Sequence, residues 1–324
     1  MYGQAEQAIP PKAHTIKGAT QHLIFMSMPP EETHPHSPST PPRVLGVIPA
    51  RLASTRLPRK MLREIAGEPM LAWVYRAARA CRALDGVLIA TDSSEIMQLA
   101  QRFGFPAVFT PEDCASGTDR VHAVAESIPA DIYVNIQGDE PLLRPEHLDA
   151  LLAPMLVPRG DGRVVDVATL ATPCPPDQFH SVHVVKVVCA RDGRALYFSR
   201  APIPLDREGT GDGVQPLKHL GLYAFRRDVL GRFPRLPPSR LEATEKLEQL
   251  RLLENGIDVW VSQTPYDTRG VDTEEDLAAV EALLLSGAGA EFSRDSRTFL
   301  PDSGQLECLA GPPRFSGPQP VRTR

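Results

Sequence analysis

The sequence of 324 residues is short of cysteine, of excess positive charge and of long hydrophobic runs. Its five cysteines are scattered without a CxxC pair, which argues against a disulfide framework or a zinc site and fits a reduced, cytosolic chain. The formal net charge of −5 argues against a general nucleic-acid binder, because such proteins usually carry a basic excess. No apolar run is long enough for a membrane span, and the N-terminus lacks the layout of a secretory signal.

A folded body is predicted between two looser terminal segments. Hydrophobic residues make up 42% of the chain, which is close to the ordinary globular level and sufficient for a core. Residues 1–42 and 287–324 are predicted to be disordered, because they are rich in proline, serine and other small or polar residues. Their roles stay open, as does a translation start at Met26 or Met28. We therefore predict one folded domain over residues 43–286, without an internal repeat.

Strand and helix patterns alternate through the first half of this body. Short apolar runs predict strands at residues 44–48, 87–90, 107–109 and 132–136. Apolar residues that share one helical face predict helices at residues 70–81, 96–103, 121–128 and 148–155. Gly104 is placed to end the second helix, and Ser116 with Asp119 forms a capping box before the third. Such alternation predicts a parallel sheet with helices on both faces.

The pattern changes after residue 165, where strand signals continue but helices become fewer. Strands are predicted at residues 165–170, 184–189, 220–225 and 259–261, and mixed strand directions are expected there. Helices are predicted at roughly 243–255 and at 273–285, the second opened by a capping box of Thr273 and Asp276. The predicted fold class is therefore α/β, a mixed sheet flanked by helices.

The segment PARLASTRLPRK, residues 49–60, directly follows the first predicted strand. Loops at the carboxyl ends of parallel strands are where α/β sheets bind ligands. Arginine binds two phosphate oxygens with its planar fork and lysine adds a compact charge, and this loop carries Arg51, Arg56, Arg59 and Lys60. A solvated basic loop is the alternative, but the position after a buried strand favours a phosphate site. The segment matches neither GxxxxGK[ST] nor GxGxxG.

Two acidic segments are candidates for a metal site. In IQGDEP, residues 136–141, Asp139 follows a glycine at the end of the fourth predicted strand. Opposite a cationic phosphate loop it is a candidate ligand for Mg²⁺, which is commonly held by one or two carboxylates and by substrate phosphates. In GVDTEED, Asp272 precedes the last helix and is explained equally well as part of its cap. A metal role for Asp272 requires the fold to return it beside Asp139.

Two further polar groups lie on segments that otherwise read as core. SGTDR, residues 116–120, begins a helix, whose free N–H groups suit a polar ligand, although capping explains the segment equally well. Taken singly, a histidine or tyrosine on a core strand is more often structural. Together they favour a pocket for a polyhydroxylated, acidic substrate, in which Arg200 would pair a carboxylate; the group comprises Arg200, His219, Tyr223, Glu248 and Gln249.

The ordered set of motifs resembles a known family. IPARLASTRLPRK, ATDSSEI, SGTDR, VNIQGDEP, VKVV, ALYFSRAPIP, KHLGLYAFR, LEQLR and GVDTEEDL occur in this order over residues 44–285. They are similar to those of the 3-deoxy-manno-octulosonate cytidylyltransferases, the CMP-Kdo synthetases. The resemblance implies a Rossmann-like nucleotidyltransferase fold with a smaller subregion for dimerisation and sugar binding. It also implies a cytoplasmic homodimer that uses Mg²⁺ and converts CTP and Kdo into CMP-Kdo and diphosphate, for lipopolysaccharide biosynthesis.

The resemblance also implies roles for individual residues. Nucleotide contacts would come from Ala50, Arg51, Ser54, Lys60, Asp92, Ser116, Gly117, Thr118 and Arg120. Kdo would be bound by Gln137, Arg200, His219, Tyr223, Glu248 and Gln249. Mg²⁺ would be held by Asp139 and Asp272, which with Arg51 and Lys60 would form the catalytic set.

Three positions depart from the family pattern, and two other functions stay open. Arg59 stands where the family often has glycine, and Cys114 and Ala115 stand where histidine and glutamine are common. One alternative is a cytidylyltransferase for another acidic sugar, such as 8-amino-Kdo or a sialate. The other is a non-catalytic nucleotide-binding protein, against which the retained lysine and both carboxylates argue.

Overall fold

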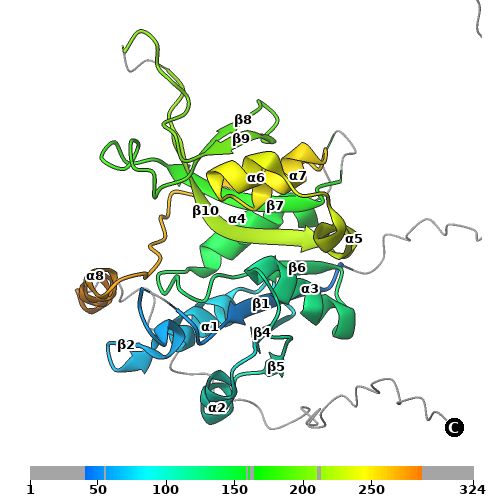
Figure 1. The fold of residues 1–324 in the computed structure, drawn as a ribbon, viewed down its shortest axis with the longest axis vertical. Coiled ribbons are helices and arrows are strands. Elements are labelled where there is room, and N and C mark those ends of the chain that lie inside the picture. The colour runs from blue at the N-terminus through cyan, green and yellow to red at the C-terminus, as the bar shows by residue number, and fades with distance from the viewer. Residues whose placement is uncertain (1–40, 55, 158–159, 161–163, 210–212, 287–324) are drawn as a thin grey trace, which may run out of the picture. The chain divides into compact units, whose positions relative to one another are not determined.

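A mixed sheet of nine strands forms the centre of the described chain (Figure 1). The computed structural model describes residues 41–286, apart from 55, 158–159, 161–163 and 210–212. The segments predicted to be disordered lie outside this range, except for residues 41 and 42. Seven strands follow one another across the sheet in the order β11–β7–β10–β6–β1–β4–β5, and β8 and β9 extend it from β10.

The first half of the sheet is parallel, as predicted. Its strands are β1 (Val44–Ala50), β4 (Gly86–Thr91), β5 (Ala107–Phe109) and β6 (Ile132–Asn135). The helices between them are α1 (Met70–Ala80), α2 (Ser94–Phe103), α3 (Gly117–Ser127) and α4 (Pro145–Leu156). Gly104 ends α2 in the left-handed conformation, and the reciprocal capping box of Ser116 and Asp119 opens α3.

The second half has the mixed strand directions that were expected. It comprises β7 (Val167–Pro173), β8 (Lys186–Cys189), β9 (Ala195–Ser199), β10 (Leu217–Arg226) and β11 (Val259–Gln263). β10 runs antiparallel to both β6 and β7, whereas β11 is parallel to β7. The sequence did not predict β9, nor the short hairpin of β2 (Glu64–Ile65) and β3 (Glu68–Pro69).

The single helix predicted at 243–255 is wrong. The structure has two helices there, α6 (Arg240–Glu245) and α7 (Gln249–Glu254). Lys246 adopts the left-handed conformation, with φ of 55°, and this ends α6. An L-residue rarely continues a helix in that conformation, so the chain turns before α7 begins. Another unpredicted helix, α5 (Arg227–Arg232), follows β10.

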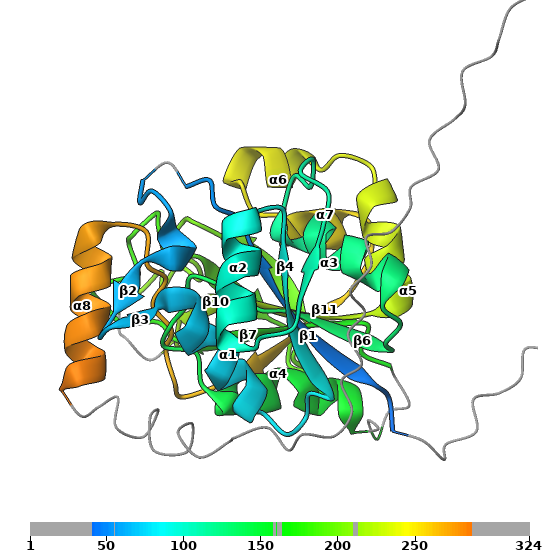
Figure 2. The ribbon, with the colours of Figure 1, turned by 90° about the horizontal axis from the view of Figure 1, so that it is seen from below.

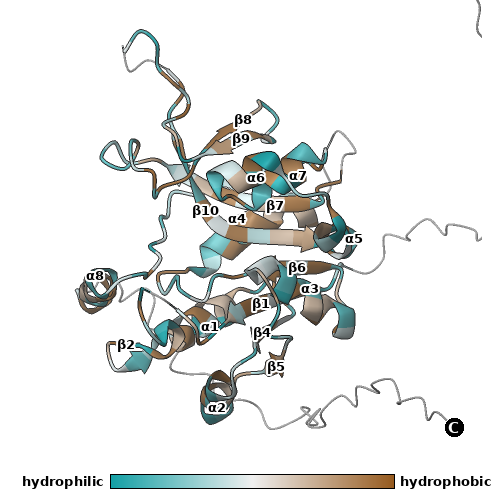
Figure 3. Cartoon of the chain, viewed as in Figure 1, coloured by the Kyte–Doolittle hydropathy of each residue, from teal (hydrophilic) through white to brown (hydrophobic). Residues whose placement is uncertain are grey.

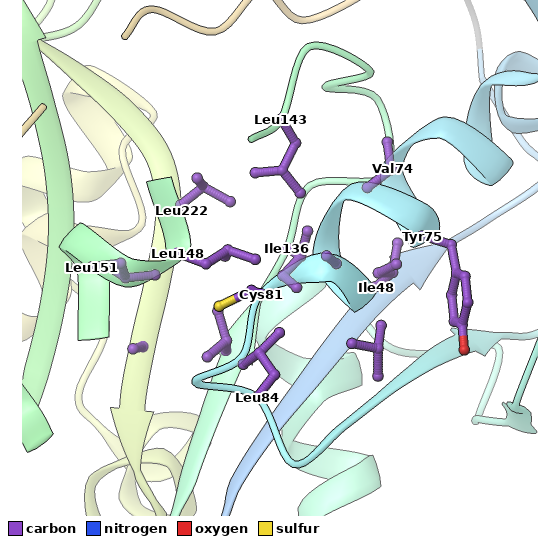
Figure 4. Close-up of a cluster of buried hydrophobic side chains, with 14 of the residues drawn as sticks. Ile48, Val74, Tyr75, Cys81, Leu84, Ile136, Leu143, Leu148, Leu151 and Leu222 are labelled. Carbon is purple, nitrogen blue, oxygen red and sulfur yellow. The ribbon is translucent and has the colours of Figure 1, made fainter. Parts of the chain in front are cut away.

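Helices cover both faces of the sheet, and each face has its own hydrophobic core (Figure 2). One core lies under α1, α2 and α4, and Figure 4 shows Ile48, Val74 and Leu148 among its side chains. The other core lies under α3, α5 and α7 and includes Tyr133 and Phe225. Alternate residues of one strand serve opposite cores, because strand side chains alternate between the two faces.

A third, smaller core holds the last helix in place. α8 (Glu274–Leu285) lies beside β2 (Figures 1 and 2) and packs Val280 and Leu284 against the hairpin residue Ile65. Leu57, from the loop after β1, and Val271, just before α8, are fully buried in this core. The core therefore brings a late segment of the chain to the loop that follows the first strand.

Figure 3 shows hydrophobic residues concentrated on the central strands, while α2 and α6 carry many hydrophilic ones. Among the described helices, none has the length and apolar content needed to cross a bilayer.

Candidate active site

A cleft of about 550 Å³ lies at the carboxyl ends of the parallel strands β1 and β6. This is the edge at which α/β sheets bind ligands. Seven of the predicted nucleotide contacts line it: Ala50, Arg51, Ser54, Lys60, Ser116, Gly117 and Arg120. Gln137, Asp139 and Asp272 also line it, so the catalytic residues named from the resemblance all reach one cleft.

Lys60 lies between the two predicted metal ligands. Its Nζ donates to Asp139 Oδ2 at 2.6 Å and to Asp272 Oδ1 at 2.9 Å. Arg56 forms a second ion pair with Asp272, at 3.0 Å. The carboxylates are contributed by segments more than a hundred residues apart, and they share one ammonium group. The condition for a role of Asp272, that the fold return it beside Asp139, is therefore met.

Two backbone features bring the segments of Asp139 and Asp272 together. The N–H of Val271 donates to the carbonyl of Asp139 at 2.9 Å, which joins the segment before α8 to the turn after β6. At Gly138 an added Cβ would lie 3.1 Å from Met61 Sδ and 3.2 Å from the carbonyl oxygen of Pro49. Only glycine lets the turn approach the first loop this closely without a shift of its neighbours.

Lys60 is the buried charge of the cluster, with 8% of its surface exposed. Burial by itself lowers the pKa of an ammonium group, because it removes the hydration of the charged form. The charges and hydrogen bonds of Asp139 and Asp272 outweigh this effect, so the pKa of Lys60 is raised above its usual value. Lys60 therefore stays protonated and supplies a fixed positive charge inside the cleft.

The four cations of the loop are used differently from one another. Arg59 turns away from the cleft and forms an ion pair with Glu95, at the start of α2. Its backbone is left-handed, with φ of 57°, a conformation that glycine adopts without strain. This accounts for the frequent glycine of the family at this position. Arg51 is exposed in the cleft and makes no ion pair with any described residue, so it is available for phosphate.

Two predicted nucleotide contacts do not line the cleft. Asp92 forms an ion pair with the buried Arg120, with 2.6 Å between Asp92 Oδ2 and Arg120 Nη2. Thr118 is only 2% exposed, and its hydroxyl donates to Glu248. Asp92 is thus a neighbour of the cleft through Arg120, whereas Thr118 faces the residues predicted to bind the sugar.

Two of the predicted sugar residues, Gln137 just after β6 and His219 on β10, form hydrogen bonds within the protein. Gln137 Nε2 donates to the carbonyl of Gly221 at 2.9 Å. The hydroxyl of Thr169 donates to the carbonyl of Leu222, so it accepts from His219 Nε2, at 2.9 Å. Burial lowers the pKa of His219 to about 3, and the ring is therefore neutral at physiological pH.

Tyr223 lies next to His219, with 5.5 Å between the ring centroids. Burial, and then the charge of Glu248, raise the pKa of Tyr223, which keeps its hydroxyl protonated. That hydroxyl has no hydrogen-bond partner within the described chain, and the same is true of Gln249 Nε2. A ligand hydroxyl or carboxylate is the kind of group that satisfies such atoms.

Arg200 is placed differently from the prediction that it pairs a substrate carboxylate. Its Nε donates to the carbonyl of Glu245 at 2.8 Å and its Nη1 to the carbonyl of Val182 at 3.0 Å. Glu245 also accepts from the backbone N–H of Arg200. Several donors of this guanidinium are therefore engaged by the protein, and a role toward the sugar stays a prediction.

Asn135 and Lys186 are buried near the site and were not singled out from the sequence, and the half-buried Glu140 lies in the same region. Asn135 ends β6 at 3% exposure, and its Oδ1 has no described partner. Burial, followed by the charge of Asp139, raises the pKa of Glu140 to about 7. Lys186 is fully buried and donates to the carbonyls of Ser181, Val184 and Arg200. The available signal was a polar residue inside an apolar run, as in IYVN and VVKVV.

The donor set of the cleft fits Mg²⁺. No group of three or more histidine, cysteine, aspartate or glutamate residues forms a metal cage within the described ranges. Asp139 and Asp272 nevertheless converge on one cation, the ammonium of Lys60. Mg²⁺ is typically held by one or two carboxylates with the remaining positions taken by water and phosphate, so two converging carboxylates suffice.

A cationic loop after the first parallel strand, facing two carboxylates across a cleft, defines a nucleotidyltransferase. A family model described as cytidylyltransferase matches residues 45–259. The chain is 66% identical over 242 residues to the 3-deoxy-manno-octulosonate cytidylyltransferase of Acidobacterium capsulatum, covering 75% of this chain and 96% of the relative. It is 52% identical to the enzyme of the same name from Koribacter versatilis, covering 80% of this chain and 99% of the relative.

A solved structure agrees with these relatives. The structure of CMP:2-keto-3-deoxy-manno-octonic acid synthetase complexed with CTP has a TM-score of 0.71 and 42% sequence identity, covering 75% of this chain and 99% of that one. The chain belongs to the cytidylyltransferase family and, within it, to the 3-deoxy-manno-octulosonate cytidylyltransferases. The resemblance recognised in the sequence is thereby confirmed.

Proposed function

We propose that this chain transfers CMP from CTP to Kdo, giving CMP-Kdo and diphosphate for lipopolysaccharide biosynthesis. The relatives that share 66% and 52% of the aligned residues carry this activity in their names, and the similar solved structure contains CTP. The observation that carries the proposal is the convergence of Asp139 and Asp272 on the Lys60 ammonium in the cleft, at 2.6 and 2.9 Å from Nζ.

The chemistry asks for positioning and charge stabilisation rather than covalent catalysis. The anomeric hydroxyl of Kdo attacks the α-phosphorus of CTP in line. The bond from that phosphorus to the bridging oxygen breaks, diphosphate leaves, and the hydroxyl proton passes to solvent. Lys60 and Arg51 stabilise the negative charge that grows on the phosphate oxygens. None of the described side chains in the cleft is placed as an evident general base.

Asp139 and Asp272 would hold the Mg²⁺ that accompanies CTP. When bound, the ion neutralises phosphate charge and lowers the pKa of a hydroxyl that it contacts. Their charge is balanced by Lys60 and Arg56. If Asp139 and Asp272 held the ion, Lys60 and Arg56 would be free to contact the phosphate oxygens of CTP.

The second substrate is assigned to the polar groups of β6, β10 and α7. Kdo carries a carboxylate and several hydroxyls, which matches a pocket with neutral donors and acceptors. His219 and Tyr223 are kept neutral by burial, and Gln249 has an unused amide donor. We also expect a homodimer in the cytoplasm; the four cysteines of the described chain, Cys81, Cys114, Cys174 and Cys189, are all free, which is consistent with a reducing compartment.

A diphosphate-release assay tests the proposal. Purified protein is given CTP and Mg²⁺ with Kdo, 8-amino-Kdo or neuraminate in separate reactions, and CMP-sugar formation is followed by chromatography. The proposal predicts release that depends on both CTP and Kdo. A preference for another acidic sugar would change the assigned substrate, while the proposed reaction class would stay the same. CTP binding without release for any acid would indicate a non-catalytic nucleotide-binding protein.

A further inference from the structure

A buried polar chain connects the start of α3 to the sugar-binding residues of α7. Asn135 Nδ2 donates to the hydroxyl oxygen of Thr118 at 3.3 Å. The hydroxyl of Thr118 in turn donates to Glu248 Oε1. Asn135 and Thr118 are 3% and 2% exposed, so both side chains are shielded from solvent.

The position of Asn135 makes this row of buried hydrogen bonds unfavourable for the stability of the fold. Asn135 lies on the α3 face of the sheet, where its strand neighbours in register are Val47 and Tyr223. Its Oδ1 has no described hydrogen-bond partner, and a buried, unsatisfied carbonyl oxygen costs free energy. A leucine of similar size would avoid this cost. The contact that Asn135 does make is the donation to Thr118, which points to a purpose other than packing.

That donation orients the hydroxyl of Thr118. An oxygen that accepts from Asn135 has its own proton free to point elsewhere, and Glu248 is the acceptor that it meets. Glu248 is therefore held as an acceptor beside the ring of Tyr223, whose pKa its charge raises. Burial raises the pKa of Glu248, and the hydroxyls of Thr118 and Ser116 counteract this by stabilising the carboxylate.

We propose that Asn135 and Thr118 are positioning residues for the acidic sugar, and that they act by holding Glu248 in the orientation that receives a sugar hydroxyl. This inference rests on the proposed function, since it assigns two residues to its second substrate. It also moves Thr118 from the nucleotide site, where the family resemblance places it, to the sugar site. Gly117, its neighbour, still faces the cleft and the nucleotide.

A matched pair of substitutions tests the assignment. Thr118→Val keeps the shape of the side chain and removes the hydroxyl, whereas Thr118→Ser keeps the hydroxyl. In steady-state kinetics with CTP, Mg²⁺ and Kdo, Thr118→Val is expected to raise the KM for Kdo roughly tenfold or more, the effect of losing a hydrogen bond to a charged group. The KM for CTP should stay within about threefold of wild type by the same reasoning. Thr118→Ser is expected to restore most of the Kdo affinity.

Asn135→Leu gives an independent measurement. It is expected to raise the KM for Kdo while keeping or raising the melting temperature, because it removes an unsatisfied buried oxygen. Ser127→Ala, at the far end of α3, is the control for effects on the helix alone. A raised KM for CTP with unchanged KM for Kdo in Thr118→Val would return Thr118 to the nucleotide site and overturn the inference.

Lower melting temperatures of Thr118→Val and Asn135→Leu, with both KM values unchanged, would also overturn the inference. The hydrogen bonds from Asn135 through Thr118 to Glu248 would then serve only the fold. If the wild-type protein releases no diphosphate with Kdo or any other acidic sugar, the proposed function fails and this inference fails with it. Wild-type turnover with wild-type kinetics in Thr118→Val would instead refute the positioning role alone.

Discussion

At the scale of single residues, a substitution at Asp139 gives the most direct test of the proposed metal site. It pairs with Lys60 and is the first candidate ligand for Mg²⁺. Asp139→Asn keeps the shape and removes the charge, so we expect turnover to be nearly abolished while the far-ultraviolet circular dichroism is unchanged. Asp267→Asn, which breaks an ion pair with Lys218 outside the cleft lining, is the control and should retain activity. Wild-type rates for Asp139→Asn in Mg²⁺ would show that the metal assignment is wrong.

Arg59 illustrates a residue whose backbone matters more than its charge. Its left-handed conformation costs an L-residue about 1 kcal/mol, and its ion pair with Glu95 is exposed and contributes little. Arg59→Ala loses the ion pair and keeps the strain, whereas Arg59→Gly loses both. We expect Arg59→Gly to be the more stable variant of the two by up to about 1 kcal/mol in urea unfolding, with unchanged KM for CTP in both. A raised KM for CTP in both variants would instead place Arg59 at the phosphates.

His219 should make the fold sensitive to acid. Its folded-state pKa is about 3, far below the 6.5 of an unperturbed histidine, so the unfolded chain binds the proton first as the pH falls. The stability tied to the neutral ring is complete above pH 6.5 and is lost between 6.5 and 3. At pH 5 the loss amounts to at most about 2 kcal/mol, because each pH unit below 6.5 removes at most about 1.4 kcal/mol.

Urea unfolding of the wild-type protein and of His219→Gln at pH 7.5 and pH 5 measures this contribution. The wild type should lose more stability than the variant over this interval, because glutamine can bond to Thr169 but does not titrate. Equal losses would show that His219 is protonated in the folded state at pH 5.

At the scale of elements, the sequence predicted best where one pattern decides the structure. The parallel strands and their helices follow from apolar periodicity and capping residues such as Ser116 and Asp119, which act locally. The prediction of a single helix at 243–255 failed because the helix is interrupted at Lys246 by a left-handed backbone conformation. No glycine or proline stands there to indicate the interruption. β9 and the β2–β3 hairpin are too short or too interrupted by polar residues to give a period.

In the candidate site, too, local features could be predicted from the sequence and long-range ones could not. The places of the cationic loop and of Asp139 in the cleft could be predicted because each follows a buried strand, which is a local feature. Asp272 could not be placed from the sequence, since its position depends on Val271 and Leu57 sharing a core across more than two hundred residues. The partners of Arg59 and Thr118 were equally inaccessible, because they lie on other elements.

The docking of α8 should therefore control the geometry of Asp272. Val280 is fully buried in the small core with Val271 and Leu57, and its truncation to alanine removes two methyl groups worth about 1.6 kcal/mol of burial. We expect Val280→Ala to speed hydrogen exchange in α8 and β2 and to lower turnover, while exchange in β1 and β6 stays slow. Leu283→Ala, on the exposed side of the same helix, is the control. Uniformly faster exchange across the sheet would show that α8 does not open separately.

At the scale of the whole molecule, the three hydrophobic cores and the cleft lining described above come from residues within 41–286. The relative from Acidobacterium capsulatum is covered over 96% of its length by 242 aligned residues, so it has no counterpart for most of the two terminal segments. A trimmed protein of residues 41–286 is therefore expected to melt cooperatively at the temperature of the full chain.

Its kcat/KM for CTP and for the acidic sugar should match the full chain within about threefold, which corresponds to less than 1 kcal/mol of transition-state stabilisation. Comparison of both proteins by differential scanning calorimetry and by diphosphate release tests this expectation. Removing 1–40 and 287–324 separately shows which end acts if the two proteins differ. A trimmed chain that melts normally but turns over slowly would show that a terminal segment contributes to the reaction without contributing to the fold.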